Sequence, residues 1–188
     1  DRLRSRGLGD VYKRQVRDLL YGVLLPSGAD ACETLARAVG GSEEGFVAMM
    51  NQKAEELGLT NTHFENCTGL HNDNHYSTCR DIAVLMSECL KSDTFREIVT
   101  REVYTTEATA SHPEGITLYD TMLHRFTSYE MSTTLENGAV IEGGKTGFTD
   151  EAGQCLVSFA EYGGEEYILV TAEAVSYTHL RAHETGAY

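Results

Sequence analysis

The hydrophobic pattern of this chain changes once along its length, and this change constrains the fold more than any other feature. Before about residue 100, apolar residues recur three and four positions apart, which is the spacing of an amphipathic helix. Beyond that point apolar and polar residues alternate, as in strands that bury one face. Because the helical pattern comes first and the strand pattern last, the chain does not alternate strands with helices. The pattern therefore predicts an α+β protein with an antiparallel sheet.

Four helices are expected in the first part of the chain, because apolar stripes recur there between capping and helix-ending residues. They cover residues 16–25, 30–39, 43–57 and 78–91, and a short amphipathic turn is expected at 95–99. Ser42 and Thr78 offer N-caps to the third and fourth helices. The segment 59–77 is rich in Asn, Gly, Thr and His, which predicts a structured loop.

A β-hairpin is expected near the end of the chain. Alternating apolar residues over 154–162 and 167–172 predict two strands, and Gly163-Gly164 supplies the turn between them. A short strand is also expected over 103–107, whereas 108–137 shows no clean pattern.

Composition limits the partners that the chain can bind. It has 15 Lys and Arg against 29 Asp and Glu among 188 residues, so its net charge at pH 7 is −14. Such a surface repels a phosphate backbone, and nucleic acid is not an expected partner. The longest apolar stretch, residues 19–25, ends at Pro26 and is far shorter than the roughly 18 residues of a membrane span.

Both ends of the chain differ from its middle. Residues 1–15 carry five basic residues against two acidic ones and have neither the apolar run nor the cleavage site of a signal peptide. Residues 176–188 lose the apolar alternation that precedes them. We therefore expect 1–15 and 176–188 to be non-native flanks of a native, more acidic segment at 16–175, with frayed native termini as the alternative.

The richest motif is Gly-Gly-Lys-Thr-Gly at residues 143–147. A phosphate-binding P-loop would need a glycine in place of Ala139 and a helix after the motif, where an alternating strand is expected instead. In the other interpretation, Lys145 and Thr146 lie on an edge strand and face a cleft, while Gly147 lets a substrate approach the backbone. A plain surface turn is the structural alternative for so short a motif.

Ser27 is a second candidate. It lies in a Ser-Gly break between the first two expected helices, from which a hydroxyl can project into a cleft, as a serine acyl-transfer site requires. For this residue taken alone, a helix cap is the structural alternative.

Three longer stretches extend these motifs. They read LLPSGADAC from residue 24, FVAMMNQKAEELGLTNTHFENCTGLHNDNHYSTCRDIAVLM from residue 46 and GGKTGFTDEAGQCLVSFA from residue 143. Together they resemble the D-alanyl-D-alanine carboxypeptidases of the low-molecular-mass penicillin-binding proteins, the S11 serine peptidases, over about residues 16–175. The resemblance implies a β-lactamase/transpeptidase-like fold, with an antiparallel sheet, flanking helices and a helical lobe, present as an incomplete catalytic domain.

The family works with three motifs. The first, Ser-x-x-Lys, supplies the nucleophile and its base, and none of the eleven serines of this chain has a lysine three residues later. We expect this motif upstream of an N-terminally truncated fragment that is inactive alone. The second appears as Ser27-Gly28-Ala29, where Ala29 replaces the usual asparagine and cannot form its hydrogen bonds. The third is complete at residues 145–147.

The resemblance implies acyl transfer at the D-Ala-D-Ala end of a peptidoglycan stem peptide. A serine outside this chain attacks the penultimate carbonyl, the terminal D-Ala leaves, and water hydrolyses the acyl-enzyme. Ser27 relays protons to the leaving amine. Lys145 and Thr146 bind the terminal carboxylate of the substrate.

Four more residues complete the implied site. Gly28 and Gly147 border the substrate, and the N–H of Phe148 contributes to the oxyanion hole. Arg125 is a weaker candidate for the carboxylate, with a solvated surface position as its alternative. The family needs no metal or cofactor and is inhibited by β-lactams. It acts outside the cytoplasm, in the cell envelope, so we expect an export signal outside this chain, and any membrane contact would be made only through segments outside it.

The predicted loop also offers a spacing typical of metal ligands. His63, Cys67, His71 and His75 lie four residues apart, so on a helix they would share one face and could bind zinc. The intervening Asn and Gly residues disfavour a helix, and zinc is the weaker alternative. The five cysteines, at positions 32, 67, 79, 89 and 155, contain no Cys-x-x-Cys, and most are expected to be buried free thiols.

Two rival functions are open. A class A β-lactamase would need a Glu-x-x-x-Asn loop, and no glutamate of this chain is followed by asparagine four positions later. A non-catalytic penicillin-binding-like module that holds peptidoglycan or a partner is favoured by Ala29 and by the missing nucleophile. The carboxypeptidase is the preferred prediction.

Overall fold

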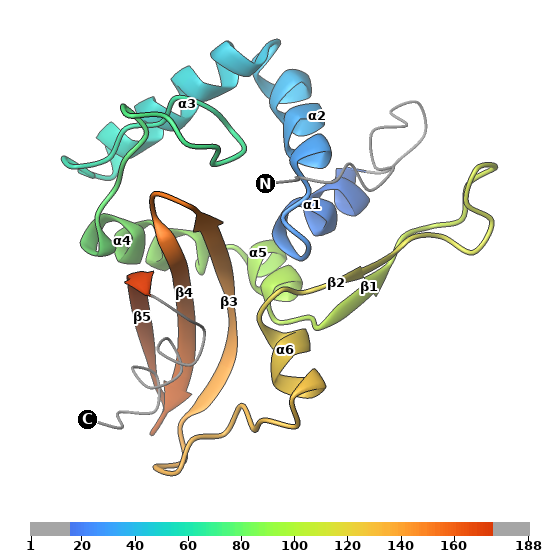
Figure 1. Ribbon diagram of the computed structural model, residues 1–188, viewed down its shortest axis with the longest axis vertical. Coiled ribbons are helices and arrows are strands. Elements are labelled where there is room, and N and C mark those ends of the chain that lie inside the picture. Colours follow the sequence, from blue (N-terminus) through green and yellow to red (C-terminus); the bar gives the residue numbers. More distant parts are fainter. Residues whose placement is uncertain (1–15, 175–188) are drawn as a thin grey trace. The chain divides into compact units, whose positions relative to one another are not determined.

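The computed structural model describes residues 16–174 of the chain (Figure 1). Its elements are, in order, α1 (Val16–Leu24), α2 (Ala29–Gly40), α3 (Glu43–Glu56), α4 (Cys79–Cys89), α5 (Asp93–Val99), β1 (Val103–Thr105), β2 (Thr117–Tyr119), α6 (Leu123–Ser128), β3 (Val140–Thr149), β4 (Gly153–Tyr162) and β5 (Glu165–Ala174). This order and the antiparallel pairing confirm the α+β prediction. The expected flanks, 1–15 and 176–188, lie outside the described residues.

The described residues form two compact units, each built from two separate stretches of chain. One comprises residues 16–77 and 101–120, and we call it the helical unit. The other comprises residues 78–100 and 121–174, and we call it the sheet unit.

The helices of the helical unit begin and end where the sequence predicts. Ser42 Oγ accepts a hydrogen bond from the N–H of Gly45 at 3.1 Å and caps α3. Gly41 ends α2 with a φ of 77°, a left-handed conformation that glycine adopts without a Cβ clash. The buried apolar residues of these helices and the start of the following loop are Leu19, Tyr21, Leu25, Ala31, Ala36, Ala54 and Leu59.

The β1–β2 hairpin belongs to the helical unit although it comes later in the chain. The Tyr104 ring of β1 stacks on Tyr21 of α1 with ring centroids 3.7 Å apart. The Tyr104 hydroxyl donates a hydrogen bond to Asp18 Oδ1 at 2.7 Å. Because Asp18 is only 3% exposed, this bond satisfies a carboxylate that water barely reaches.

The sheet unit is built on three antiparallel strands in the order β3-β4-β5. Gly163 and Gly164, with φ of 64° and 82°, form the two-residue turn between β4 and β5. The hairpin expected over 154–172 is confirmed and extends to Ala174.

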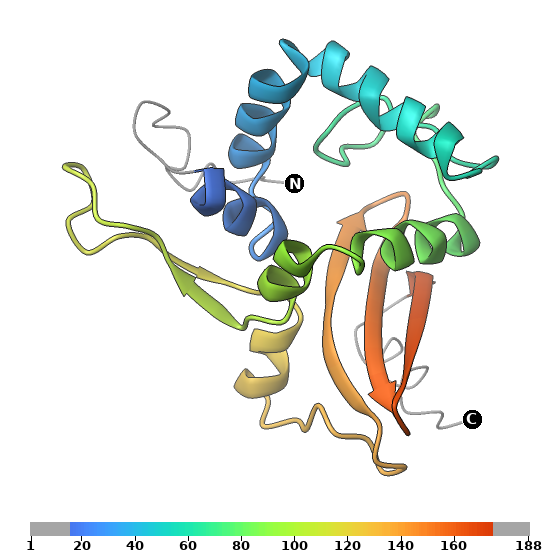
Figure 2. The ribbon, with the colours of Figure 1, turned by 180° about the vertical axis from the view of Figure 1, so that it is seen from behind.

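Three helices pack on this sheet (Figure 2). α4 contacts β5 and β4, and α5 contacts β3. Arg96 of α5 forms an ion pair with Glu166 of β5 at 2.7 Å. α6 joins an apolar cluster of the sheet unit, which contains Met122, Leu123, Phe126, Ile141, Leu156 and Ala174.

Several expectations need correction. The strand expected at 103–107 is shorter, because β1 ends at Thr105, and β2 and α6 lie within 108–137, where no element is predicted. The expectation of mostly buried thiols is wrong: Cys79 is exposed, and the other four cysteines are half-buried. Cys79 is the first residue of α4 and Cys67 lies in a loop, where neighbouring elements cover only part of a side chain.

None of the helices in residues 16–174 has the length and apolar character needed to cross a membrane.

Candidate active site

The Lys-Thr-Gly motif lies on an edge strand, as the cleft interpretation predicts. From Gly143 to Thr149, β3 pairs with β4 alone within the described part of the chain. Lys145 and Thr146 are half-buried, and Gly147 is exposed. A strand rather than a helix follows the motif, so the P-loop interpretation is wrong.

Two glycines ahead of the motif allow close packing on both sides of β3. A Cβ on Gly143 would lie 2.3 Å from the carbonyl oxygen of Val99, the last residue of α5. A Cβ on Gly144 would lie 2.4 Å from a carbonyl oxygen of β4 and 3.0 Å from Met122 Sδ. Consecutive residues of a strand face opposite sides. The two glycines therefore let β3 pack closely against α5 on one side and against Met122, the residue before α6, on the other. This packing fixes where Lys145 lies.

Thr146 contacts a residue that the sequence analysis does not identify. Thr121 Oγ1 and Thr146 Oγ1 lie 2.6 Å apart, so one hydroxyl donates to the other. On the neighbouring residue, Lys145 Nζ donates to the carbonyl oxygen of Thr146 at 2.8 Å. Thr121 precedes Thr146 by 25 residues, and no local pattern links the two. Only the packing of the segment before α6 against β3 brings them together.

Phe148 and Arg125 belong to the same sheet unit as the motif. Phe148 is 47% exposed on β3. Arg125 is half-buried on α6, between Leu123 and Phe126, which enter the apolar cluster. Their assigned roles in substrate binding stay predictions.

Ser27 lies in the helical unit, in the break between α1 and α2. Its φ is 57°, a left-handed conformation that residues with a Cβ rarely adopt. The Gly28 N–H donates to the carbonyl oxygen of Gly22 at 2.9 Å and closes the chain reversal after α1. Gly28, not Ser27, is the N-cap residue of α2, so the helix-cap alternative is wrong. Backbone strain of this kind clusters at functional sites, which favours a functional serine.

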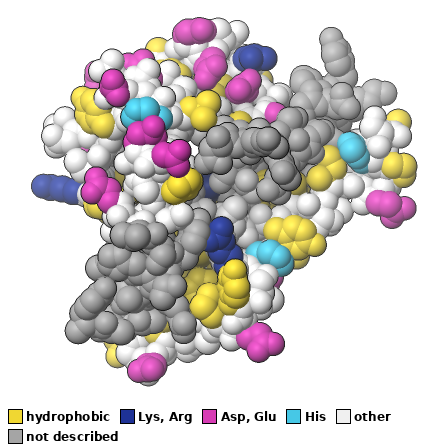
Figure 3. Space-filling model, in the orientation of Figure 1, with side chains coloured by type: hydrophobic (Ala, Val, Ile, Leu, Met, Phe, Trp, Pro, Cys, Tyr) yellow, Lys and Arg dark blue, Asp and Glu magenta, His cyan; other side chains and the backbone are white. Residues whose placement is uncertain are grey.

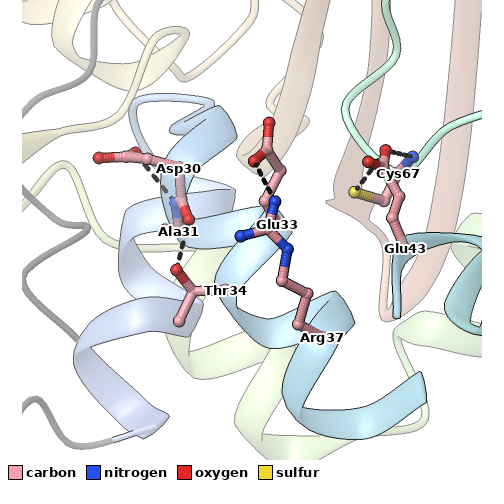
Figure 4. Close-up of polar contacts among 7 residues, drawn as sticks. All are labelled: Asp30, Ala31, Glu33, Thr34, Arg37, Glu43 and Cys67. Carbon is pink, nitrogen blue, oxygen red and sulfur yellow. Dashed lines mark hydrogen bonds and ion pairs between the residues drawn. The ribbon is translucent and has the colours of Figure 1, made fainter. Parts of the chain in front are cut away.

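Hydrogen bonds of Asp30 mark the start of α2, directly after Ala29 in the sequence (Figure 4). The Ala31 N–H donates to Asp30 Oδ1 at 2.9 Å, and the Thr34 hydroxyl donates to the carbonyl oxygen of Asp30 at 2.7 Å. Ala29 is the first residue of this regular helix. It offers only a methyl group where the related motif carries an amide.

The segment 59–77 is a structured loop, as predicted, and not a helix on which the four spaced residues would share one face. His63 and Tyr76 form a short antiparallel bridge across it. Asn66 Oδ1 accepts hydrogen bonds from the N–H groups of Gly69 at 2.8 Å and Leu70 at 3.1 Å. In residues 16–174, no group of three or more His, Cys, Asp and Glu side chains has the geometry to hold a metal ion.

The charge of the surface agrees with the acidic composition. On the face drawn in Figure 3, Asp and Glu side chains gather over the α2–α3 part of the helical unit. Against a net charge of −14, the half-buried Lys145 supplies a local positive charge beside the exposed Gly147. This arrangement suits a small anionic group such as a carboxylate.

Comparison with solved structures identifies the class of fold. The crystal structure of the Streptomyces K15 DD-transpeptidase matches with a TM-score of 0.78 and 34% sequence identity, over 91% of this chain and 65% of that one. The fold is therefore the β-lactamase/transpeptidase-like fold that the resemblance implies.

Sequence comparison identifies the family. The model of the S11 peptidases, D-alanyl-D-alanine carboxypeptidases, matches residues 5–176, and the chain belongs to this family. It is 36% identical over 156 residues to the carboxypeptidase DacF of Bacillus subtilis (strain 168), which is 82% of this chain and 37% of the relative. It is 36% identical over 181 residues to the D-alanyl-D-alanine carboxypeptidase of Streptomyces sp. (strain K15), which is 93% of this chain and 59% of the relative. The chain thus spans less than two thirds of the length of these relatives.

Proposed function

We propose that this chain is part of a serine-type D-Ala-D-Ala carboxypeptidase, which removes the terminal D-Ala from peptidoglycan stem peptides. The observation that carries the proposal is the complete Lys145-Thr146-Gly147 motif on an edge strand of a chain that belongs to this family. The proposal assigns the nucleophile and its base to a Ser-x-x-Lys segment outside this chain, since no serine of the chain has a lysine three residues later.

Lys145 and Thr146 bind the terminal carboxylate of the substrate. An ammonium group and a hydroxyl donate charge-assisted hydrogen bonds to a carboxylate, and such bonds are roughly twice as strong as neutral ones. When Thr121 donates to Thr146 across their 2.6 Å contact, the proton of Thr146 is left for the substrate. Arg125 of α6 is a weaker, additional candidate for this carboxylate.

The outer edge of β3 binds the peptide backbone of the substrate. Alternate N–H and C=O groups on an edge strand point away from the sheet and can pair with an extended peptide. The exposed Gly147 leaves room for that peptide next to the strand. The N–H of Phe148 joins the oxyanion hole, where one donor is worth roughly 3 to 4 kcal/mol.

Ser27 relays a proton toward the leaving D-Ala amine. Its strained φ of 57° holds the hydroxyl-bearing residue in a turn that Gly28 continues, with Gly28 bordering the substrate. Ala29 cannot supply the amide hydrogen bonds of the family motif, so the substrate lacks those bonds here.

Peptidoglycan stem peptides ending in D-Ala-D-Ala are the proposed partner, and β-lactams are inhibitors that acylate the same nucleophile. This substrate places the proposed enzyme in the cell envelope, outside the cytoplasm, and export is part of the proposal. No metal or cofactor is needed for acyl transfer by this route.

The test is the release of D-Ala from a peptide that ends in D-Ala-D-Ala. A longer protein that carries this chain together with a Ser-x-x-Lys segment should release one D-Ala per peptide, and replacing the serine of that segment by alanine should abolish the release. A protein that binds isolated peptidoglycan without releasing D-Ala would instead support a non-catalytic binding module, which Ala29 favours.

A further inference from the structure

The helical unit contains two cysteines that the proposed active site does not use. Cys32 lies near the start of α2, and Cys67 lies in the loop at 59–77. The Cys32 thiol donates a hydrogen bond to the carbonyl oxygen of Cys67, with Sγ 2.8 Å from that oxygen. Both residues are half-buried. The contact therefore joins two elements that lie 35 residues apart in the sequence.

The backbone that presents Cys67 is fixed on both sides. Asn51 of α3 donates to the carbonyl oxygen of Phe64 at 2.8 Å and accepts from its N–H at 2.9 Å. The side chain of Asn66 then binds the N–H groups of the residues that follow Cys67. Two rigid elements thus present the cysteines to each other, which is the preorganisation that a disulfide requires.

The sulfur of Cys67 lies at the junction of α2 and α3. Its N–H and its Sγ both lie 3.5 Å from Glu43 Oε1, at the start of α3 (Figure 4). Glu43 belongs to the first turn of the helix that follows α2. The thiol is therefore directed toward the helices and not away from them.

The two thiols also act directly on each other. Burial raises the pKa of the Cys67 thiol to about 12, with Cys32 and then Glu43 as further causes. Burial also raises the pKa of Cys32, and the neighbouring Cys67 side chain opposes this rise. Both groups are therefore protonated near neutral pH, where thiol exchange is slow and becomes faster as the pH rises.

We propose that Cys32 and Cys67 are a redox-active pair, which closes a disulfide between α2 and the loop at 59–77 on exposure to a small-molecule disulfide. The thiolate of one cysteine attacks a sulfur of the reagent and forms a mixed disulfide, releasing one reagent thiolate. The second cysteine attacks the protein sulfur of that mixed disulfide and releases the other reagent thiolate. The protein loses two protons and two electrons in total, and the reagent takes them up and is reduced to two thiols.

The other three cysteines provide internal controls. Cys79, Cys89 and Cys155 all belong to the sheet unit. Cys79 is exposed, and Cys155 Sγ contacts the carbonyl oxygen of Ala152 at 3.4 Å. If exposure alone decided reactivity, Cys79 would form the main product with the reagent.

The test is disulfide mapping of the 188-residue chain after incubation with oxidised glutathione at mildly alkaline pH. Remaining thiols are alkylated, and the peptides are identified by mass spectrometry. The native chain should yield Cys32–Cys67 as its main internal disulfide, at least about tenfold enriched over the same chain oxidised in denaturant, because the pair is held in place only when folded. An unenriched Cys32–Cys67 product, or a main product that involves Cys79, overturns the proposal.

Two matched variants separate pairing from general reactivity. Cys32→Ser should leave Cys67 open to alkylation or to a stable glutathione adduct, and Cys67→Ser should have the reciprocal effect on Cys32. Cys79→Ser should leave the Cys32–Cys67 product unchanged. Oxidation should also raise the unfolding temperature of the original chain and of Cys79→Ser, because the cross-link restricts the unfolded state. The same rise in Cys32→Ser would contradict the assignment.

Discussion

The two units hold their candidate residues in different ways. In the sheet unit, strand pairing with β4 and the close packing of two glycines against neighbouring elements fix the Lys-Thr-Gly motif. In the helical unit, Ser27 depends on a left-handed backbone conformation between two helices. That unit also needs a hairpin from residues 101–120, whose Tyr104 binds Asp18 of α1. The motif on the strand is thus held by backbone pairing and close packing, whereas the motif in the turn depends on a strained backbone conformation.

The largest effect is expected from the charged residue of the sheet unit. In the longer protein that carries Ser-x-x-Lys, Lys145→Ala should lower kcat/KM for D-Ala release by about 100-fold, because the loss of a charge-assisted hydrogen bond to the substrate costs up to about 3 kcal/mol. Lys91→Ala is the matched control, since Lys91 is an exposed lysine paired with Glu88. Equal kcat/KM values for the two variants would show that Lys145 does not bind the substrate.

The packing of β3 is tested by a pair of glycine substitutions. Gly143→Ala should lower the free energy of unfolding by about 2 to 3 kcal/mol, because its Cβ would lie 2.3 Å from the carbonyl oxygen of Val99. Gly147→Ala should cost under about 1 kcal/mol, since its Cβ would meet Cys155 Cβ at an ordinary 3.7 Å. Urea unfolding measures both. Similar losses in the two variants would show that the double glycine does not position the strand.

The helical unit should be sensitive at a residue far from Ser27 in sequence. Tyr104→Phe removes the donor to the buried Asp18 and should cost about 1 to 3 kcal/mol of unfolding free energy. Tyr76→Phe is the control, because Tyr76 is 54% exposed. If both variants unfold at the same urea concentration as the original chain, the hairpin does not support α1 through this bond.

The Thr121–Thr146 contact should have a smaller effect, on catalysis. Thr121→Val removes the hydroxyl that orients Thr146 and should lower kcat/KM for D-Ala release by about five- to tenfold, which corresponds to about 1 kcal/mol. Thr127→Val changes an exposed threonine of α6 and should have no such effect. If Thr121→Val retains the full kcat/KM, Thr121 has no positioning role.

A further effect is expected in the response of the helical unit to alkaline pH. Burial, followed by the hydrogen bond to Asp18, raises the pKa of Tyr104 from 10.0 to about 12. The folded state therefore favours the protonated phenol, so its stabilising contribution is complete below pH 10 and is lost as the pH rises toward 12. The free energy of unfolding should fall more steeply over this interval in the original chain than in Tyr104→Phe. Parallel pH profiles would contradict the raised pKa.

The sequence predicts most of what local patterns determine. The helix boundaries near Ser42 and Thr78 follow from side-chain caps, and the β4–β5 hairpin follows from alternation around Gly163-Gly164. The strand after the Lys-Thr-Gly motif likewise follows from its alternation. These features depend on interactions between residues that are close in the chain.

The remaining features depend on contacts between distant residues, which a single sequence does not reveal. Thr121 meets Thr146, and Tyr104 meets Asp18 across 86 residues, and neither pair has a periodic pattern. The left-handed φ of Ser27 is also unexpected, because serine has no intrinsic preference for that conformation. The partial exposure of the cysteines likewise depends on which loops cover them.

The most direct test of the central claim is covalent labelling by a fluorescent penicillin. The claim is that the Lys-Thr-Gly strand serves an acyl-enzyme whose nucleophile lies outside these 188 residues. The longer protein with its Ser-x-x-Lys segment should take up one label on the serine of that segment, and the 188-residue chain alone should take up none. Labelling of Ser27 or any other serine of this chain, or failure of the longer protein to label, would contradict the claim.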